Sequence, residues 1–98
     1  MNVNNTNLND WVNPKELYKD SEYTIIWGQI RDIKALGTHW NTTEQNTFKI
    51  EPDFVAMAIL EKLRTIYSVN GKNSKYITID NLEKAISEIF LQYPERDN

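Results

Sequence analysis

The chain has 98 residues, no cysteine and a formal net charge of −3. The lack of cysteine excludes disulfides and thiolate metal sites, and the acidic balance argues against a protein that holds nucleic acid by a general basic excess. No apolar run approaches the roughly 20 residues of a membrane span, and no signal-peptide core is visible. We expect one domain of a cytoplasmic protein. Its twelve asparagines are typical of an AT-rich genome, such as that of a low-GC bacterium, a phage or a mobile element.

The first ten residues, MNVNNTNLND, are polar and have no periodic apolar face. They predict a flexible tail before a single helical domain covering residues 11–93. Asn13, Pro14 and Glu16 then follow the pattern of a helix N-terminus, so a short helix is expected from Pro14 to about Asp20. Pro94 is expected to end the last helix, which leaves residues 94–98 as a C-terminal tail.

A second helix is expected from about Glu22 to Leu36. Its apolar residues recur at alternating spacings of three and four residues, which is the spacing of one helix face. They are Tyr23, Ile26, Ile30, Ile33 and Leu36. Gly37 follows where a left-handed residue usually ends a helix. The β-branched run Thr24–Ile26 is an opposing strand signal, but the apolar stripe lasts four turns and favours the helix.

The longest and most apolar helical pattern runs from Glu51 to Val69. Pro52 suits the first position of a helix, where its missing N–H has no partner to lose. Every residue from Phe54 to Leu60 is apolar. This half of the helix has no solvent face and is expected to be wrapped by its neighbours. A last helix is expected over residues 80–93.

Two short strands, Thr47–Ile50 and Tyr76–Ile79, can pair as a ribbon. Each follows a polar loop and precedes a helix, so the chain repeats a helix, loop, strand, helix order that looks like the layout of paired EF-hands. The calcium-ligand positions carry no carboxylate. They are Asn41, Thr43, Gln45 and Pro52 in the first loop, and Asn70, Lys72, Ser74 and Asn81 in the second. We therefore expect a mainly α, four-helix domain with this layout and no bound calcium or other metal.

The segment from Ala58 to Ile86 also resembles the opening of a winged helix domain, with a first helix, a short strand and a second helix. A recognition helix and a wing should follow, and the residues after Tyr93 do not supply them. This resemblance implies the alternative function, a small dimeric DNA-binding transcriptional regulator of the helix-turn-helix or winged-helix type.

Groups suited to catalysis are few. His39 is the single histidine in the sequence. No serine lies in the pattern of a nucleophile elbow, and the three glycines are too isolated to form a phosphate loop. We therefore expect neither an enzyme nor a cofactor.

Tryptophan is over-represented in binding hot spots, and the chain has three. Trp11 is expected in the core, whereas Trp40 lies in a polar loop beside His39. The predicted contact surface comprises Trp27, Arg31, Lys34, His39 and Trp40. The sequence thus favours a non-enzymatic interaction or regulatory protein that binds a larger protein partner, such as the host machinery of a phage. Self-association into a homodimer through the second helix is a further expectation.

Overall fold

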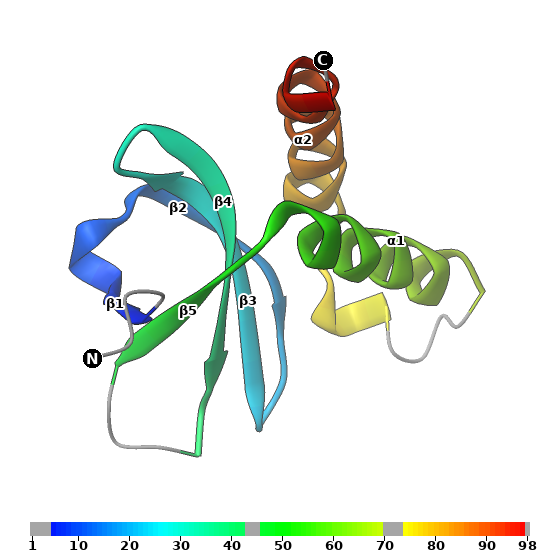
Figure 1. Ribbon diagram of the computed structural model, residues 1–98. Coiled ribbons are helices and arrows are strands. Elements are labelled where there is room, and N and C mark those ends of the chain that lie inside the picture. The colour runs from blue at the N-terminus through cyan, green and yellow to red at the C-terminus, as the bar shows by residue number, and fades with distance from the viewer. Residues whose placement is uncertain (1–4, 43–45, 70–73, 98) are drawn as a thin grey trace.

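The computed structural model describes residues 5–42, 46–69 and 74–97. Within these segments the chain forms a five-stranded antiparallel sheet and two α-helices (Figure 1). The strands are β1 (Asn5–Asn7), β2 (Val12–Lys19), β3 (Tyr23–Ile30), β4 (Ile33–Trp40) and β5 (Thr47–Glu51), and the helices are α1 (Asp53–Val69) and α2 (Ile79–Asp97). The prediction of a mainly α, four-helix domain is therefore wrong.

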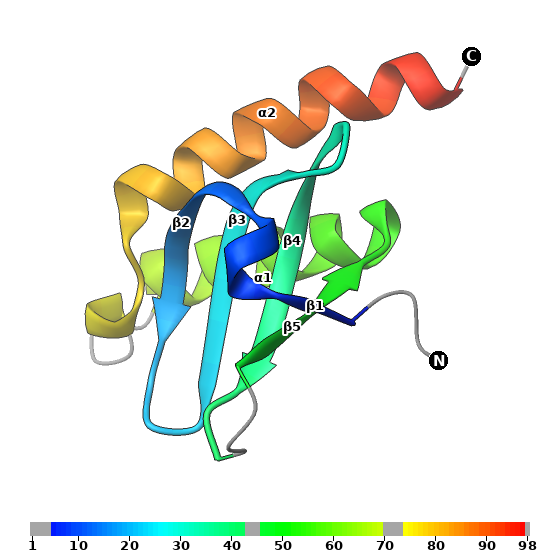
Figure 2. The same cartoon turned by 90° about the vertical axis from the view of Figure 1, so that its left-hand side faces the viewer.

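Strands β2 to β5 form a meander, and β1 joins the far side of β5, which gives the order β1-β5-β4-β3-β2. The two helices lie on one face of the sheet, and the segment after β1 crosses the other face (Figure 2). This crossing segment contains a 3-10 turn, Leu8–Asp10. Residues 5–10, expected to belong to a flexible tail, thus supply an edge strand and the cover of the second face.

The region predicted as the second helix, Glu22–Leu36, is a β-hairpin. Strands β3 and β4 pair along their whole lengths and leave Arg31 and Asp32 as a two-residue turn. Both faces of this hairpin are covered, so β3 is buried almost continuously and shows no apolar–polar alternation. The β-branched run Thr24–Ile26 was the correct signal, because branched side chains pack well on a pleated surface.

The short helix predicted over Pro14–Asp20 is also wrong, because most of these residues belong to the edge strand β2. An edge strand tolerates Pro14 since one side of the strand has no partner to bond. Val12 and Lys15 pair with residues of β3 that are only two positions apart, and Asn13 between them has a φ of 50°. This part of β2 thus has one residue more than the facing part of β3 and forms a β-bulge, which bends β2 at this point.

The central and last helices are confirmed as α1 and α2, but their ends differ from expectation. Helix α1 begins at Asp53, and α2 begins at Ile79 and continues through Pro94 to Asp97. Within the described segments, neither helix has the length and apolar character that crossing a membrane requires.

Of the two predicted strands, Thr47–Ile50 is confirmed within β5, whereas Tyr76–Ile79 is not a strand. Tyr76 ends a 3-10 turn, and Ile77 forms an isolated bridge with Tyr18 of β2. Strand β5 pairs with β1 and β4, so the predicted ribbon is wrong.

Because the ribbon is not formed, the predicted layout of paired EF-hands is also absent. The first position of the first predicted loop, Asn41, accepts a hydrogen bond from Thr24 through Oδ1 and donates one from Nδ2 to the carbonyl of Asp20. Thr43, Gln45, Asn70 and Lys72 lie outside the described residues. Asn41 thus serves to tie the end of β4 to the turn between β2 and β3.

Two apolar clusters lie on opposite faces of the sheet. The larger one fills the space between the sheet and the helices, and its largest fully buried members are Leu17, Leu36, Leu60, Leu82 and Ile89. The smaller one lies under the crossing segment and contains Trp11, Ile26, Ile30, Ala35 and Phe48. The expectation that Trp11 belongs to the core is confirmed.

Trp11 fastens the crossing segment to the second face of the sheet. Its indole Nε1 donates a hydrogen bond to Oγ1 of Thr6 at 2.7 Å, and that hydroxyl donates to the carbonyl of Phe48. A Cβ atom on Gly37 would stand 2.9 Å from Cζ2 of the Trp11 ring. Gly37 is therefore needed for close packing against the ring, not for the helix end predicted there.

Candidate functional site

The five predicted contact residues lie on the β3–β4 hairpin, but they do not share one surface. Arg31 lies in the turn at one end of the hairpin, and His39 and Trp40 lie at the opposite end of β4. Trp27 and Lys34 belong to the helix-facing side, where they meet α2. The predicted helix that would carry Trp27, Arg31 and Lys34 does not exist, because this region is a hairpin.

Trp27 and Lys34 converge on Glu88 of α2. Trp27 is only 3% exposed, and its Nε1 donates a hydrogen bond to Oε1 of Glu88 at 2.7 Å. Lys34 Nζ donates to the other carboxylate oxygen at 3.1 Å. Burial acts to raise the pKa of Glu88, but the hydrogen bonds from Trp27 and Lys34 outweigh it and hold the pKa below its ordinary value. These two predicted residues anchor α2 to the sheet.

Sequence reasoning missed the role of Glu88. A usable signal was present, since Glu88 and Gln92 are polar residues one turn apart that lie beside the apolar stripe of the last helix. A carboxylate next to an apolar stripe often has a partner across the helix–sheet boundary. The partner could not be identified while β3 and β4 were read as a helix.

His39 and Trp40 differ in exposure. The half-buried His39 ring stacks on Phe48 with 4.9 Å between ring centres, and its Nδ1 lies 2.7 Å from the carbonyl oxygen of Thr47. Nδ1 must carry a proton to donate this bond. Trp40 is 60% exposed and packs edge-on against Tyr23 at 4.6 Å. Trp40 is therefore the predicted contact residue with the largest exposed aromatic surface.

The first two turns of α1 expose apolar side chains. Phe54 is 69% exposed, Ala58 is exposed one turn later, and Val55 and Ile59 are half-buried beside them. The prediction that neighbours wrap this half of the helix is wrong for the described part of the chain. The side of α1 that faces the core carries Ala56, Leu60 and Leu63.

A shallow hollow of about 480 Å³ lies along the exposed side of α1. Its lining is almost entirely apolar, and Ile25 of β3 forms part of it. Tyr23 is two residues from Ile25 on the same face of β3, and Trp40 pairs directly with Tyr23. The apolar surface thus continues from α1 onto the end of the hairpin. We call it the α1–hairpin surface, defined by Tyr23, Ile25, Trp40, Phe54, Val55, Ala58 and Ile59.

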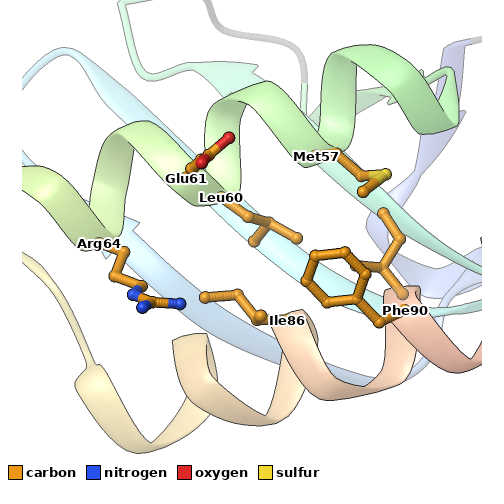
Figure 3. A pocket seen from close by; sticks show the side chains of 7 residues that line it. Met57, Leu60, Glu61, Arg64, Ile86 and Phe90 are labelled. Atoms are coloured by element: carbon orange, nitrogen blue, oxygen red, sulfur yellow. The ribbon is translucent and has the colours of Figure 1, made fainter.

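A smaller pocket opens on the other side of α1, between α1 and α2 (Figure 3). Its volume is about 90 Å³, which suits a single apolar side chain. The apolar lining consists of Met57, Leu60, Ile86, Ile89 and Phe90. Glu61 and Arg64 complete the lining from the α1 side (Figure 3). Apolar concave surface therefore lies on both sides of the first half of α1.

Two cations border these apolar surfaces. Lys62 lines the hollow, and Arg64 lines the smaller pocket. Among the side chains that the structure describes, those of residues 5–42, 46–69 and 74–92, the salt bridge joins Lys34 to Glu88, so neither Lys62 nor Arg64 forms a salt bridge with an acidic residue there. No carboxylate lines the hollow. Lys62 thus makes the border of the α1–hairpin surface suited to an acidic partner, whereas Arg64 shares the smaller pocket with Glu61.

Comparison with known protein families, curated proteins and solved structures found no match. Among the residues that the structure describes, no three histidine or acidic side chains gather closely enough to hold a metal ion. The surfaces and pockets of the chain itself are therefore the grounds for a functional proposal.

Proposed function

We propose that this chain is a non-enzymatic interaction protein whose α1–hairpin surface binds an apolar helix of a larger protein partner. The observation that carries the proposal is the exposed apolar face of the first two turns of α1, where Phe54 and Ala58 point away from the core. Single exposed apolar residues need no explanation, but a contiguous patch of them is typical of an interaction site.

The charges around the surface specify the partner further. Lys62 favours a helix that carries apolar anchor residues flanked by Asp or Glu. A second copy of this chain fits less well, because the hollow contains Lys62 and no carboxylate, so self-pairing would bring like charges together. The pocket beside Phe90 can take one further anchor side chain of the same partner.

The cytoplasmic location and the origin from a phage or mobile element, acting on host machinery, belong to this proposal and are supported by composition. The DNA-binding alternative has less support. A helix-turn-helix would use the helices predicted at Pro14–Asp20 and Glu22–Leu36, which are replaced by strands. A winged helix would need the strand predicted at Tyr76–Ile79, which is not formed.

Cross-linking in the source cell tests the proposal. A photoreactive residue in place of Ala58 should capture a partner, which is then purified and measured against the intact chain. Phe54→Glu should weaken its binding at least about tenfold, the effect of losing one hot-spot contact. Lys62→Glu should weaken binding to an acidic helix, and Asp or Glu changed to Lys in that helix should restore it.

Val69→Glu is the matched control, because it places the same charge at an exposed apolar position on the far end of α1. This control should bind like the unchanged chain, and all three variants should keep its thermal midpoint. The proposal is wrong if the partner binds the Phe54→Glu variant normally, if that variant unfolds, or if the captured partner is a second copy of this chain.

A further inference from the structure

A polar pocket of about 310 Å³ lies between α2 and the bulged part of β2, away from the α1–hairpin surface. Four charged residues line it: Lys15 from β2, Lys34 from β4, and Lys84 and Glu88 from α2. Trp27 contributes to the lining as the hydrogen-bond partner of Glu88. The pocket thus joins three consecutive strands to a helix that begins about 40 residues after the last of them.

The charges in this pocket do not balance. Glu88 is already bonded to Lys34 and to the indole of Trp27. Lys15 and Lys84 form no salt bridge with the described side chains, those of residues 5–42, 46–69 and 74–92. Three ammonium groups therefore face one carboxylate, although the chain as a whole has a net charge of −3. Such a local excess of positive charge within a concavity attracts anions.

The backbone of β2 gives the pocket its shape. Asn13 adopts a φ of 50°, which a non-glycine residue rarely adopts. The bulge that contains Asn13 lies beside Lys15, and both residues line the pocket. Bulges are over-represented next to active sites, where they redirect a side chain. Asn81 holds the opposite rim in place, because its Nδ2 donates a hydrogen bond to the carbonyl of Glu16 at 2.9 Å.

We propose that this pocket binds a small molecule that carries a phosphate group, with Lys15 and Lys84 as its charged contacts. Lysine binds phosphate as a point charge, and the Lys34–Glu88 pair forms a fixed, largely neutralised part of the lining. The volume lies near the lower limit of small-molecule sites. The amide side chains of Asn13 and Gln29 offer hydrogen bonds to an uncharged part of the same ligand.

The indole N–H of Trp27 is a direct reporter of binding, because it is bonded to Glu88 within the pocket. The ¹⁵N-labelled chain should be titrated with inorganic pyrophosphate at constant ionic strength. The Trp27 indole signal should shift and saturate. The double substitution Lys15→Gln and Lys84→Gln should weaken pyrophosphate binding at least about tenfold, since both positive charges are lost.

The control removes the same two charges elsewhere, with Lys19→Gln and Lys49→Gln, at exposed positions that do not line the pocket. It should bind pyrophosphate like the unchanged chain. A titration without saturation would show general charge attraction and overturn the proposal. So would equal weakening in both double variants, or a shift of the Trp27 signal that survives the loss of Lys15 and Lys84.

Discussion

The side-chain amide of Gln92 on α2 pairs with the backbone of Lys34 on β4 through two hydrogen bonds. The amide oxygen accepts from the Lys34 N–H at 3.2 Å, and the amide nitrogen donates to the Lys34 carbonyl at 3.1 Å. Strand β5 pairs with β4 only over Leu36–Thr38, so no neighbouring strand reaches Lys34 on this side. The Gln92 side chain therefore substitutes for a strand at the open edge of β4.

We predict that Gln92→Leu lowers the free energy of unfolding by about 1–3 kcal/mol. The substitution leaves a partly buried N–H and a partly buried carbonyl of Lys34 without their partners, and each unsatisfied group carries a cost of this order. Leu91→Ala is the control, because the neighbouring Leu91 side chain is exposed and should change stability by less than about 0.5 kcal/mol. Urea unfolding measures both, and equal effects would contradict the role given to Gln92.

Glu88 should make stability depend on pH in the acid range. The pKa of Glu88 in the folded state lies below its ordinary value. The contribution of Glu88 to the free energy of unfolding is therefore complete when the pH is above the ordinary pKa, and it is lost as the pH falls through the lowered pKa. Glu88→Gln keeps an oxygen that can accept the Trp27 hydrogen bond but cannot titrate. The difference in unfolding free energy between the two proteins should therefore shrink from about pH 7 to about pH 3. A constant difference would show that Glu88 does not titrate in this way.

Tyr18 should make stability depend on pH in the alkaline range. Its hydroxyl donates a hydrogen bond to Oδ2 of Asp20, and this bond together with burial raises the pKa of Tyr18 to about 12. The contribution of Tyr18 to the free energy of unfolding is complete when the pH is below the ordinary tyrosine pKa of about 10, and it is lost as the pH rises towards about 12. Tyrosinate absorbance should include a late-titrating component, and Tyr18→Phe should remove it. Titration of all tyrosines near their ordinary pKa would contradict the contact.

The sequence identified α1, α2 and the short strand within β5 because each keeps one clear periodicity or lies next to clear turn signals. It misidentified the β3–β4 hairpin for a physical reason. Both faces of β3 are buried, since Trp27 faces the helices and Ile26 faces Trp11, so the alternation of a half-exposed strand is absent. The remaining apolar spacings of three and four residues then match a helix.

The candidate site was predictable only in part. The apolar half of α1 was visible in the sequence, and so was the exposed position of Trp40. The described chain leaves the half of α1 around Phe54 uncovered. This exposure depends on the position of the sheet, which no local sequence pattern encodes. The convergence of Trp27 and Lys34 on Glu88 spans more than half of the chain. Such contacts become visible only after the topology is known.

The fit between Trp11 and the hairpin should be sensitive to a single methyl group. A Cβ at Gly37 would lie 2.9 Å from the Trp11 ring and 3.1 Å from the Ile26 side chain, both in the smaller cluster. We predict that Gly37→Ala lowers the free energy of unfolding by about 1–3 kcal/mol, the usual cost of overpacking. Gly37→Ala should be measured both in the intact chain and in the Trp11→Ala variant. If it lowers stability equally in both, contact with the Trp11 ring is not the cause of the loss.

The turn between β3 and β4 is a feature that the sequence did not reveal. Arg31 and Asp32 connect β3 to β4, and Arg31 has a φ of 55°. Asn13 and Arg31 are the non-glycine residues with positive φ in the described segments, so Asp32 has a negative φ. A positive φ at the first loop residue alone is the pattern of a type II′ turn, which prefers glycine at that position. The absence of glycine here removed the usual hairpin signal from the sequence.

The two turn residues should therefore respond to glycine with opposite signs. Arg31→Gly relieves a left-handed conformation that costs about 1–2 kcal/mol, while the added backbone freedom of glycine costs about 0.5–1 kcal/mol. A net gain of about 0.5–1 kcal/mol in unfolding free energy is expected. Asp32→Gly carries the entropic cost without the relief and should lower stability by about 0.5–1 kcal/mol. Urea unfolding of both variants distinguishes the hairpin from the helix expected over Glu22–Leu36, since glycine at either position would destabilise a helix interior.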